Sequence, residues 1–291
     1  LFVAETQTAG KGRRGRCWQS PAGSSISMSI LLRPVMNPSD APMLTLVMAY
    51  AATKALREKT ELDIGIKWPN DLVVSGKKIS GILTEMSAEI DYINHVVIGI
   101  GINVNMESFP EDIAKTATSL RIEAGKEFRR FELIAAIMEH FEKAYEAVCE
   151  AGSLEPIMED YNRLLVNCGR RVRVLEPEHE YDALALGIDK TGELQVECED
   201  GSRKSVFAGE VSVREFMYQD KIVLCGANSY EEKFYMNPDF DNLPQHIKDE
   251  LKIMCVLYVH DVGGILTLVF EENGELEFEV TSAEGDPMFD E

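Results

Sequence analysis

The first 165 residues switch repeatedly between two hydrophobic patterns, one with the two-residue period of strands and one with the spacing of helices. Runs with strand character cover 26–32, 64–68, 72–74, 79–86 and 95–104. Runs with helical character cover 42–59, 130–151 and 156–165. The dipeptide Ser75-Gly76 separates two of the strand runs and predicts a hairpin turn. Strands mixed with helices in this order predict an α+β layered domain.

The pattern changes at about residue 166, and strand signals alone continue to residue 214. The runs with strand character are 171–174, 181–188, 194–198 and 207–213. Turn residues around Gly192 and Gly201 separate them. Short strands at such spacing predict a small β-barrel over 166–214.

A third region covers 217–291 and has its own pattern and charge. Strand runs at 221–225, 233–236, 264–270 and 276–280, with a helical run at 243–259, predict a β-β-α-β-β module. The region carries four lysines and 17 acidic residues, whereas the whole chain has a net charge of −21. No catalytic constellation is found in it. A second hypothesis makes Met217 the start of a separate small protein, which an intact mass corresponding to 291 residues would contradict.

Composition narrows the class of protein. A hydrophobic fraction of 45% and a charged fraction of 27% are typical of a globular protein. No apolar run reaches the roughly 18 residues that a membrane helix requires, so no membrane partner is predicted. The six cysteines form no Cys-x-x-Cys pair, which predicts reduced thiols and a cytoplasmic location. The acidic balance predicts no nucleic-acid binding through this chain, because that binding needs a basic face.

Against this acidic background, one segment concentrates positive charge. It reads Gly10-Lys11-Gly12-Arg13-Arg14-Gly15-Arg16-Cys17-Trp18. Glycines let the backbone approach a ligand closely, and arginines match phosphate or carboxylate with paired donors. The tryptophan offers a flat face to a base. A solvated basic loop or a nucleic-acid contact would explain such a run on its own.

Two further segments decide between these alternatives. The second contains Lys67-Trp68-Pro69-Asn70-Asp71 and then Lys77-Lys78-Ile79-Ser80-Gly81-Ile82-Leu83, and the third is Ile98-Gly99-Ile100-Gly101-Ile102-Asn103-Val104. In this order and at this spacing, the three segments resemble the catalytic domain of the biotin protein ligase (biotin–acetyl-CoA-carboxylase ligase) family. The resemblance continues to Arg214, and three separate motifs carry it.

The resemblance implies both architecture and activity. It implies a class II synthetase-like biotin/lipoate ligase catalytic domain over 1–165, an SH3-like barrel over 166–214, and an unrelated appendage over 217–291. The implied enzyme activates biotin with ATP and magnesium (Mg²⁺) to biotinyl-5'-AMP. It then transfers biotin to a lysine of the biotin carboxyl carrier domain of a carboxylase, and a homodimer is among the implied assemblies.

The family's roles carry over to matching positions in this sequence. Implied biotin contacts are Gln7, Lys11, Gly12, Arg13, Lys78, Gly81, Ile82, Leu83, Gly99 and Gly101. Implied ATP contacts are Arg13, Arg16, Trp18, Lys67, Asn70, Asp71 and Asn103, with Asp71 also reaching the magnesium ion. Lys78 and Arg13 are the implied catalytic residues. Lys78 would offset the negative charge of the transition state between the biotin carboxylate and the phosphate.

Structural explanations compete for several of these residues. Trp18 and Trp68 could be core aromatics, and Asp71 could be a turn residue. Pro69 could simply end a strand. Gly99-Ile100-Gly101 could be a strand that packs tightly against a helix. Arg14 and Lys77 are expected to be exposed.

Other functions and one departure from the family pattern remain open. A lipoate or octanoate transferase shares the general fold, and a non-catalytic binding protein is the alternative from another class. A phosphate-binding loop of the NTPase type fails, because Arg16-Cys17 stands where Lys-Ser/Thr is required. Members of the family begin further upstream, with a serine and a threonine that contact biotin. The sequence is therefore expected to lack one wall of the biotin pocket, and no repressor function is predicted.

Overall fold

The computed structural model describes residues 1–15, 18, 21–175, 180–198 and 200–207, apart from the side chains of Arg14 and Asp112. It also describes the backbone of four later strands, 212–215, 222–225, 265–270 and 276–281. The chain divides into two compact units, Leu1–Glu215 and Phe216–Glu291. Each unit is described by itself.

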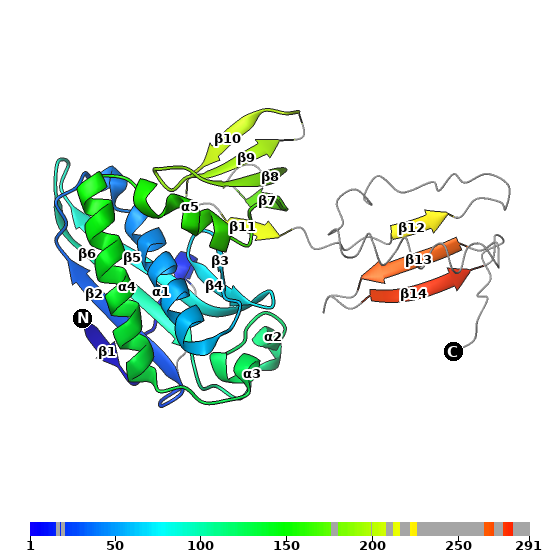
Figure 1. Ribbon diagram of the computed structural model, residues 1–291, viewed down its shortest axis with the longest axis horizontal. Helices are drawn as coiled ribbons and strands as arrows, with labels where there is room; N and C mark the ends of the chain where they lie inside the picture. The colour runs from blue at the N-terminus through cyan, green and yellow to red at the C-terminus, as the bar shows by residue number, and fades with distance from the viewer. Residues whose placement is uncertain are drawn as a thin grey trace. The chain divides into compact units, whose positions relative to one another are not determined.

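The first unit is built on a six-stranded antiparallel sheet (Figure 1). Its strands are β1 (Phe2–Ala4), β2 (Ser25–Leu32), β3 (Gly65–Lys67), β4 (Asp71–Val74), β5 (Lys77–Ala88) and β6 (Ile93–Asn103). They lie in the order β1-β2-β6-β5-β4-β3. The two longest strands, β5 and β6, are neighbours near the middle of the sheet, and their glycines Gly81 and Gly101 face each other in register. At the hairpin between β4 and β5, Ser75 and Gly76 both have positive φ, as a tight turn requires.

Helices cover one face of this sheet. The long helices α1 (Met43–Thr60) and α4 (Arg130–Ala151) contact each other and lie across the same face of the sheet in Figure 1, and α5 (Glu155–Leu164) packs against both. Alternate residues of β6, namely Ile98, Ile100 and Ile102, are buried in the core beneath them. Burial of each such side chain contributes about 1.5–3 kcal/mol relative to exposure. The helices therefore cover one face of the sheet.

Five strands form the second sheet of this unit. They are β7 (Arg171–Leu175), β8 (Glu180–Ile188), β9 (Leu194–Cys198), β10 (Arg203–Val206) and β11 (Ser212–Glu215), in the order β10-β9-β8-β7-β11. Trp68 joins this sheet to the first one, because its buried indole Nε1 donates to the carbonyl oxygen of Gly192 at 3.1 Å. Trp68 is therefore a core aromatic, as one interpretation of the sequence proposed.

The closing strand expected at 207–213 is wrong in position. In its place β10 occupies Arg203–Val206 and β11 occupies Ser212–Glu215. Polar residues dominate β10, so its alternation was hidden, yet all four of its residues pair with β9 across the Asp200-Gly201 turn. Backbone pairing with a neighbouring strand, rather than burial of a hydrophobic face, determines this element.

Two short helices were not expected from the sequence. They are α2 (Glu111–Ala114) and α3 (Leu120–Ala124). The second has capping residues that could have been recognised, because the Ser119 side chain accepts from the Ile122 backbone N–H and Gly125 ends the helix with positive φ. Helices of one turn leave too little periodicity for a pattern to detect.

The second unit contains a three-stranded antiparallel sheet in its described residues. Its strands are β12 (Ile222–Cys225), β13 (Ile265–Phe270) and β14 (Leu276–Thr281), in that order. Three of the four strand predictions for this region are confirmed in position. The strand expected at 233–236 and the helix expected at 243–259 lie outside the described residues.

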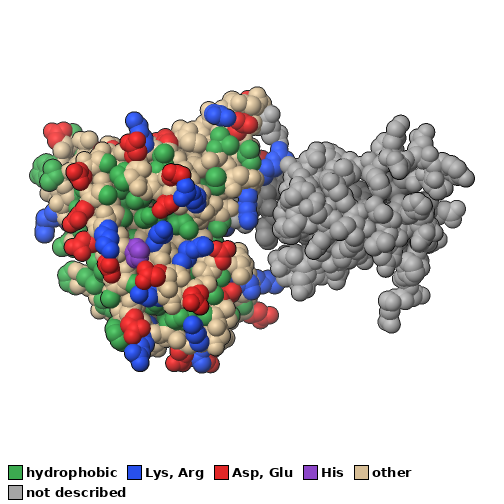
Figure 2. All heavy atoms as spheres, in the orientation of Figure 1, with side chains coloured by type: hydrophobic (Ala, Val, Ile, Leu, Met, Phe, Trp, Pro, Cys, Tyr) green, Lys and Arg blue, Asp and Glu red, His purple; other side chains and the backbone are tan. Residues whose placement is uncertain are grey.

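Three further properties concern the described residues. None of the helices in these residues has both the length and the apolar character needed to span a membrane. Among the described residues, Cys149, Cys168 and Cys198 are free cysteines. On the face shown in Figure 2, acidic and basic side chains are interspersed over the described part of the chain.

Candidate functional site

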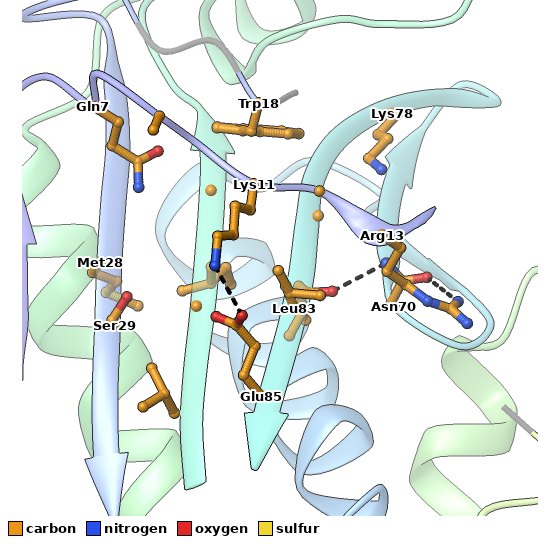
Figure 3. Close-up of a pocket in the computed structure, with 18 residues that line it drawn as sticks. Gln7, Lys11, Arg13, Trp18, Met28, Ser29, Asn70, Lys78, Leu83 and Glu85 are labelled. Atoms are coloured by element: carbon orange, nitrogen blue, oxygen red, sulfur yellow. Dashed lines mark hydrogen bonds and ion pairs between the residues drawn. The ribbon is translucent and has the colours of Figure 1, made fainter. Parts of the chain in front are cut away.

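A cavity of about 210 Å³ lies among residues of β2, β5 and β6 and the glycine-rich loop (Figure 3). Its lining residues are Gln7, Ala9, Lys11, Gly12, Arg13, Trp18, Met28, Ser29, Asn70, Lys78, Gly81, Ile82, Leu83, Glu85, Val97, Gly99, Ile100 and Gly101. All three sequence motifs contribute to this list. Segments as far apart as residues 7 and 101 therefore meet in one place.

Glycines form the part of the cavity on which Trp18 lies. A Cβ atom on Gly101 would stand 2.4 Å from the indole of Trp18, and one on Gly81 would stand 3.4 Å from it. Only glycine at position 101 lets the ring lie flat against the strand. The neighbour that requires this glycine is the loop tryptophan and not a helix, so the interpretation of a strand packed tightly against a helix is wrong at Gly101.

Backbone and side-chain bonds hold the glycine-rich loop over the strands. The Trp18 backbone N–H donates to the Gly10 carbonyl oxygen at 3.0 Å, which closes the loop. Arg13, in a short 3₁₀ turn, donates from Nη1 to Asn70 Oδ1 at 3.0 Å, and Asn70 Nδ2 donates to the Ile82 carbonyl oxygen at 3.1 Å. Asn70 thus connects the loop arginine to the cavity-lining strand β5.

Lys78 lies at one end of the cavity, beside Trp18 (Figure 3). Its Nζ donates to Asp71 Oδ1 at 2.6 Å and lies 5.8 Å from the centre of the Trp18 ring. Its backbone is held on both sides, because its N–H donates to the Thr116 carbonyl oxygen at 2.8 Å and its carbonyl oxygen accepts from the Thr118 N–H at 2.9 Å. This cation is therefore fixed in direction and placed where an anionic group could replace Asp71.

Glu85 marks another part of the cavity, and sequence reasoning missed it. Its Oε1 accepts from Lys11 Nζ at 3.2 Å, and Figure 3 shows this pair apart from Lys78. The two-residue period of β5 could have identified it, because Gly81, Leu83 and Glu85 all line the cavity. The cavity therefore contains two separate lysines, Lys11 paired with Glu85 and Lys78 paired with Asp71.

Most of the expected site residues come together. Twelve of them line the cavity, namely Gln7, Lys11, Gly12, Arg13, Trp18, Asn70, Lys78, Gly81, Ile82, Leu83, Gly99 and Gly101. Asp71 contacts it through Lys78. Lys67 is not among the lining residues. Arg16 lies outside the described residues, and so does the side chain of Arg14.

Asn103, which the sequence predicts to contact the nucleotide, is not among the residues that line the cavity. Its side chain is 6% exposed, and its Nδ2 donates to the Thr118 carbonyl oxygen at 3.1 Å. Through Thr118 it supports the backbone that holds Lys78.

Among the described residues, no group of three or more histidine, cysteine or acidic side chains could hold a metal ion alone.

Comparison with known proteins gives three family matches. Residues 1–103 match the model described as the biotin/lipoate A/B protein ligase family, and residues 168–214 match the biotin protein ligase C terminal domain. Residues 221–291 match a family of unknown function, DUF6145.

Individual relatives agree with these matches. The bifunctional ligase/repressor BirA of Bacillus subtilis (strain 168) is 38% identical over 215 residues, which cover 73% of this chain and 66% of that protein. The biotin–[acetyl-CoA-carboxylase] ligase of Mycobacterium tuberculosis is 30% identical over 217 residues, with 72% and 77% covered. The chain thus spans about two thirds of the length of the ligase/repressors that it matches.

A solved structure shares the fold. The biotin protein ligase from Aquifex aeolicus, determined in complex with biotin and ATP, is 32% identical and superimposes with a TM-score of 0.65. The match covers 73% of this chain and 88% of that one.

Proposed function

The chain belongs to the biotin protein ligase family, and from that premise we propose that it is an ATP-dependent biotin–[biotin carboxyl carrier protein] ligase. It activates biotin to biotinyl-5'-AMP and then transfers biotin to a lysine of an acceptor protein. The observation that carries this proposal is the cavity in which Arg13, Lys78 and Gly101, one from each motif, are collected.

The first step joins two anions. A biotin carboxylate oxygen attacks the α-phosphorus of ATP, a carbon–oxygen–phosphorus anhydride forms, and the bond to pyrophosphate breaks. Fixed cations that meet the developing charge lower the barrier of such a step. Lys78, whose backbone is held at both its N–H and its carbonyl, fits this role, and Arg13 reaches the same cavity from the loop.

The second step needs an intermediate that is kept from water. The amine nitrogen of an acceptor lysine attacks the acyl carbon, AMP leaves, and the proton of the amine passes to solvent. Until then the mixed anhydride must be shielded. The glycine-rich loop, closed by the bond between Trp18 and Gly10, lies over the strands where this shield is required.

Magnesium is proposed to enter with ATP. Magnesium sites of this kind use one or two carboxylates together with substrate phosphates. Asp71 is the carboxylate beside Lys78, and the described residues offer no larger acidic group there, so the fit is to a phosphate-held ion. When bound, the ion supplies charge neutralisation at the phosphates. The ATP contacts proposed for Asn70 and Trp18 do not depend on it.

The acceptor and the assembly are proposals of the same kind. A biotin carboxyl carrier domain is the proposed protein substrate, and a homodimer is a proposed assembly. Residues 1–165 are the proposed catalytic domain and 166–214 the proposed SH3-like domain. Residues 217–291 are proposed to be a separate acidic module.

Biotin-dependent exchange of labelled pyrophosphate into ATP tests the first step. The full chain should catalyse exchange with biotin and not with lipoate or octanoate. Lys78→Ala should reduce exchange by about a hundredfold or more, in the range seen when one preorganised charge-stabilising group is lost. The neighbouring exposed residue supplies a matched control, because Lys77→Ala should retain activity close to that of the parent chain.

Each other outcome has a defined meaning. Equal loss in both lysine variants would point to a folding defect, which circular dichroism would reveal. Exchange with lipoate in place of biotin would assign a different acyl group. A folded chain that binds ATP without exchange would contradict the ligase proposal, provided that a version extended upstream is also inactive.

A further inference from the structure

An ion-paired cluster lies at the base of the glycine-rich loop, outside the cavity. The loop leaves the sheet after β1 and returns to it at β2. Glu5 is the first residue after β1, Gly23 lies two residues before β2, and Arg130 is the first residue of α4. These three positions are far apart in the sequence and meet at one point.

Hydrogen bonds join both ends of the loop to the helix. Arg130 Nη1 donates to Glu5 Oε2 at 3.0 Å and Nη2 donates to Glu5 Oε1 at 2.7 Å, which makes the pair bidentate. Arg130 Nη1 also donates to the Ser25 carbonyl oxygen at 2.9 Å. The Gly23 backbone N–H donates to Glu5 Oε2 at 3.1 Å. The Glu5 carboxylate and the Arg130 guanidinium thus hold together the two ends of the loop, the one that follows β1 and the one that precedes β2.

The electrostatics of the helix make this arginine unusual. A cation at the first residue of a 22-residue helix faces the positive end of the helix dipole, which is unfavourable. The Glu5 carboxylate offsets this charge. The hydrogen bonds from Arg130 and then from Gly23 lower the pKa of Glu5 below its ordinary value. The ion pair between Glu5 and Arg130 is therefore fully formed above the ordinary pKa of a glutamate. It is lost only when the pH falls through the lowered pKa of Glu5.

We propose that Glu5 and Arg130 are positioning residues for the biotin-activating reaction, and that they fix both ends of the glycine-rich loop. The middle of the loop, with Lys11, Gly12 and Arg13, then lines the cavity between these two fixed ends. The proposal rests on the proposed function. Neither residue lines the cavity, so each acts through the loop.

Fixing the loop ends reduces the conformational freedom that must be lost when the loop orders around a ligand. An ion pair with an exposed partner contributes little to global stability, and here the side chain of Glu5 is 64% exposed and that of Arg130 is 26% exposed. Loss of the pair should therefore affect ligand binding more than unfolding. We expect the KM for biotin to rise about tenfold, as for loss of one charge-assisted hydrogen bond, with kcat nearly unchanged.

The test uses Glu5→Gln, Arg130→Met and the double variant in the full chain. Arg173→Met is the matched control, because Arg173 and Asp182 form another bidentate pair, with bonds of 2.9 and 3.1 Å, on the β7–β8 hairpin. Measurements are the KM and kcat of biotin-dependent pyrophosphate exchange, the rate of tryptic cleavage at the loop arginines, and the thermal midpoint. Arg130→Lys keeps the charge and removes the bidentate geometry.

Without biotin, we expect trypsin to cleave the loop faster in both single variants than in the parent chain. Saturating biotin should protect the loop from cleavage. The double variant should show a KM and a cleavage rate no larger than those of either single variant. The control should match the parent chain in KM and cleavage. Changes no larger than those of Arg173→Met would overturn the proposal, as would additive effects in the double variant. If the parent chain lacks exchange activity, the proposed function fails, whereas the cleavage rates still decide whether the pair fixes the loop.

Discussion

At single positions, the absence of a side chain is as important here as its presence. The Trp18 indole lies where any Cβ on Gly101 would overlap it, and its Nε1 is buried without a partner in the described structure. In the segment 99–103, the glycine at position 101 is therefore required because the indole of Trp18 leaves no space for a side chain there. The sequence predicts this glycine in the biotin pocket, and it lines the cavity, but the contact that requires a glycine is visible only when residues 18 and 101 meet.

Gly101→Ala should displace Trp18 and weaken biotin binding by at least about tenfold, because the added methyl group must shift either the indole or the strand. Acrylamide quenching of tryptophan fluorescence measures this displacement, since Trp68 is buried and contributes little quenching. Gly99→Ala is the control for the indole, because its added Cβ would lie no closer than 3.6 Å to any atom. Equal quenching in both variants would contradict the steric argument.

Among the elements, short irregular segments position the site as much as strands do. The segment 116–118 brackets the backbone of Lys78 with two hydrogen bonds, and Asn103 at the end of β6 holds Thr118 in place. The long helices and most of the strands were predictable because each repeats its pattern over several residues. The segment 116–118 was not, since single backbone bonds to a distant strand leave no periodicity in the sequence.

Asn103→Ala should lower the free energy of unfolding by about 1–3 kcal/mol, because the Thr118 carbonyl oxygen loses its partner in a buried position. It should also lower kcat for pyrophosphate exchange, since the backbone that holds Lys78 loosens. Chemical denaturation and steady-state kinetics measure the two effects. Asn105→Ala is the control, because Asn105 makes two comparable bonds to Phe128, away from Lys78. A raised KM for ATP with unchanged kcat would favour the nucleotide contact expected from the sequence.

For the chain as a whole, the site and its support belong to one unit. All cavity-lining residues fall between Gln7 and Gly101, and the described core extends to Val206 within Leu1–Glu215. The second sheet of this unit supports the first, because Gly192 accepts the indole hydrogen bond of Trp68. Most of the net negative charge of the chain lies beyond this unit.

A chain that ends at Glu215 should retain biotin-dependent pyrophosphate exchange within about twofold of the full chain, since no lining residue is removed and β11 can still pair with β7. A chain that ends at Leu165 should be unstable, because it loses the partner of Trp68 and exposes its core contacts. Activity assays and thermal unfolding measure both. Loss of exchange in the chain that ends at Glu215 would assign a catalytic role to residues 216–291.

The amino-acid sequence was enough to predict most of the periodic elements and to show the three motifs, because each of these consists of neighbouring residues. The resemblance of the three motifs, in their order and spacing, to a known family then predicted the family. Long-range arrangement was needed for the rest. It placed Trp18 on Gly101, turned Asn103 toward Thr118, brought Glu85 to Lys11 and joined Glu5 to Arg130. Such contacts depend on which strands become neighbours and in what register, and the free energy of that choice is spread over the whole core.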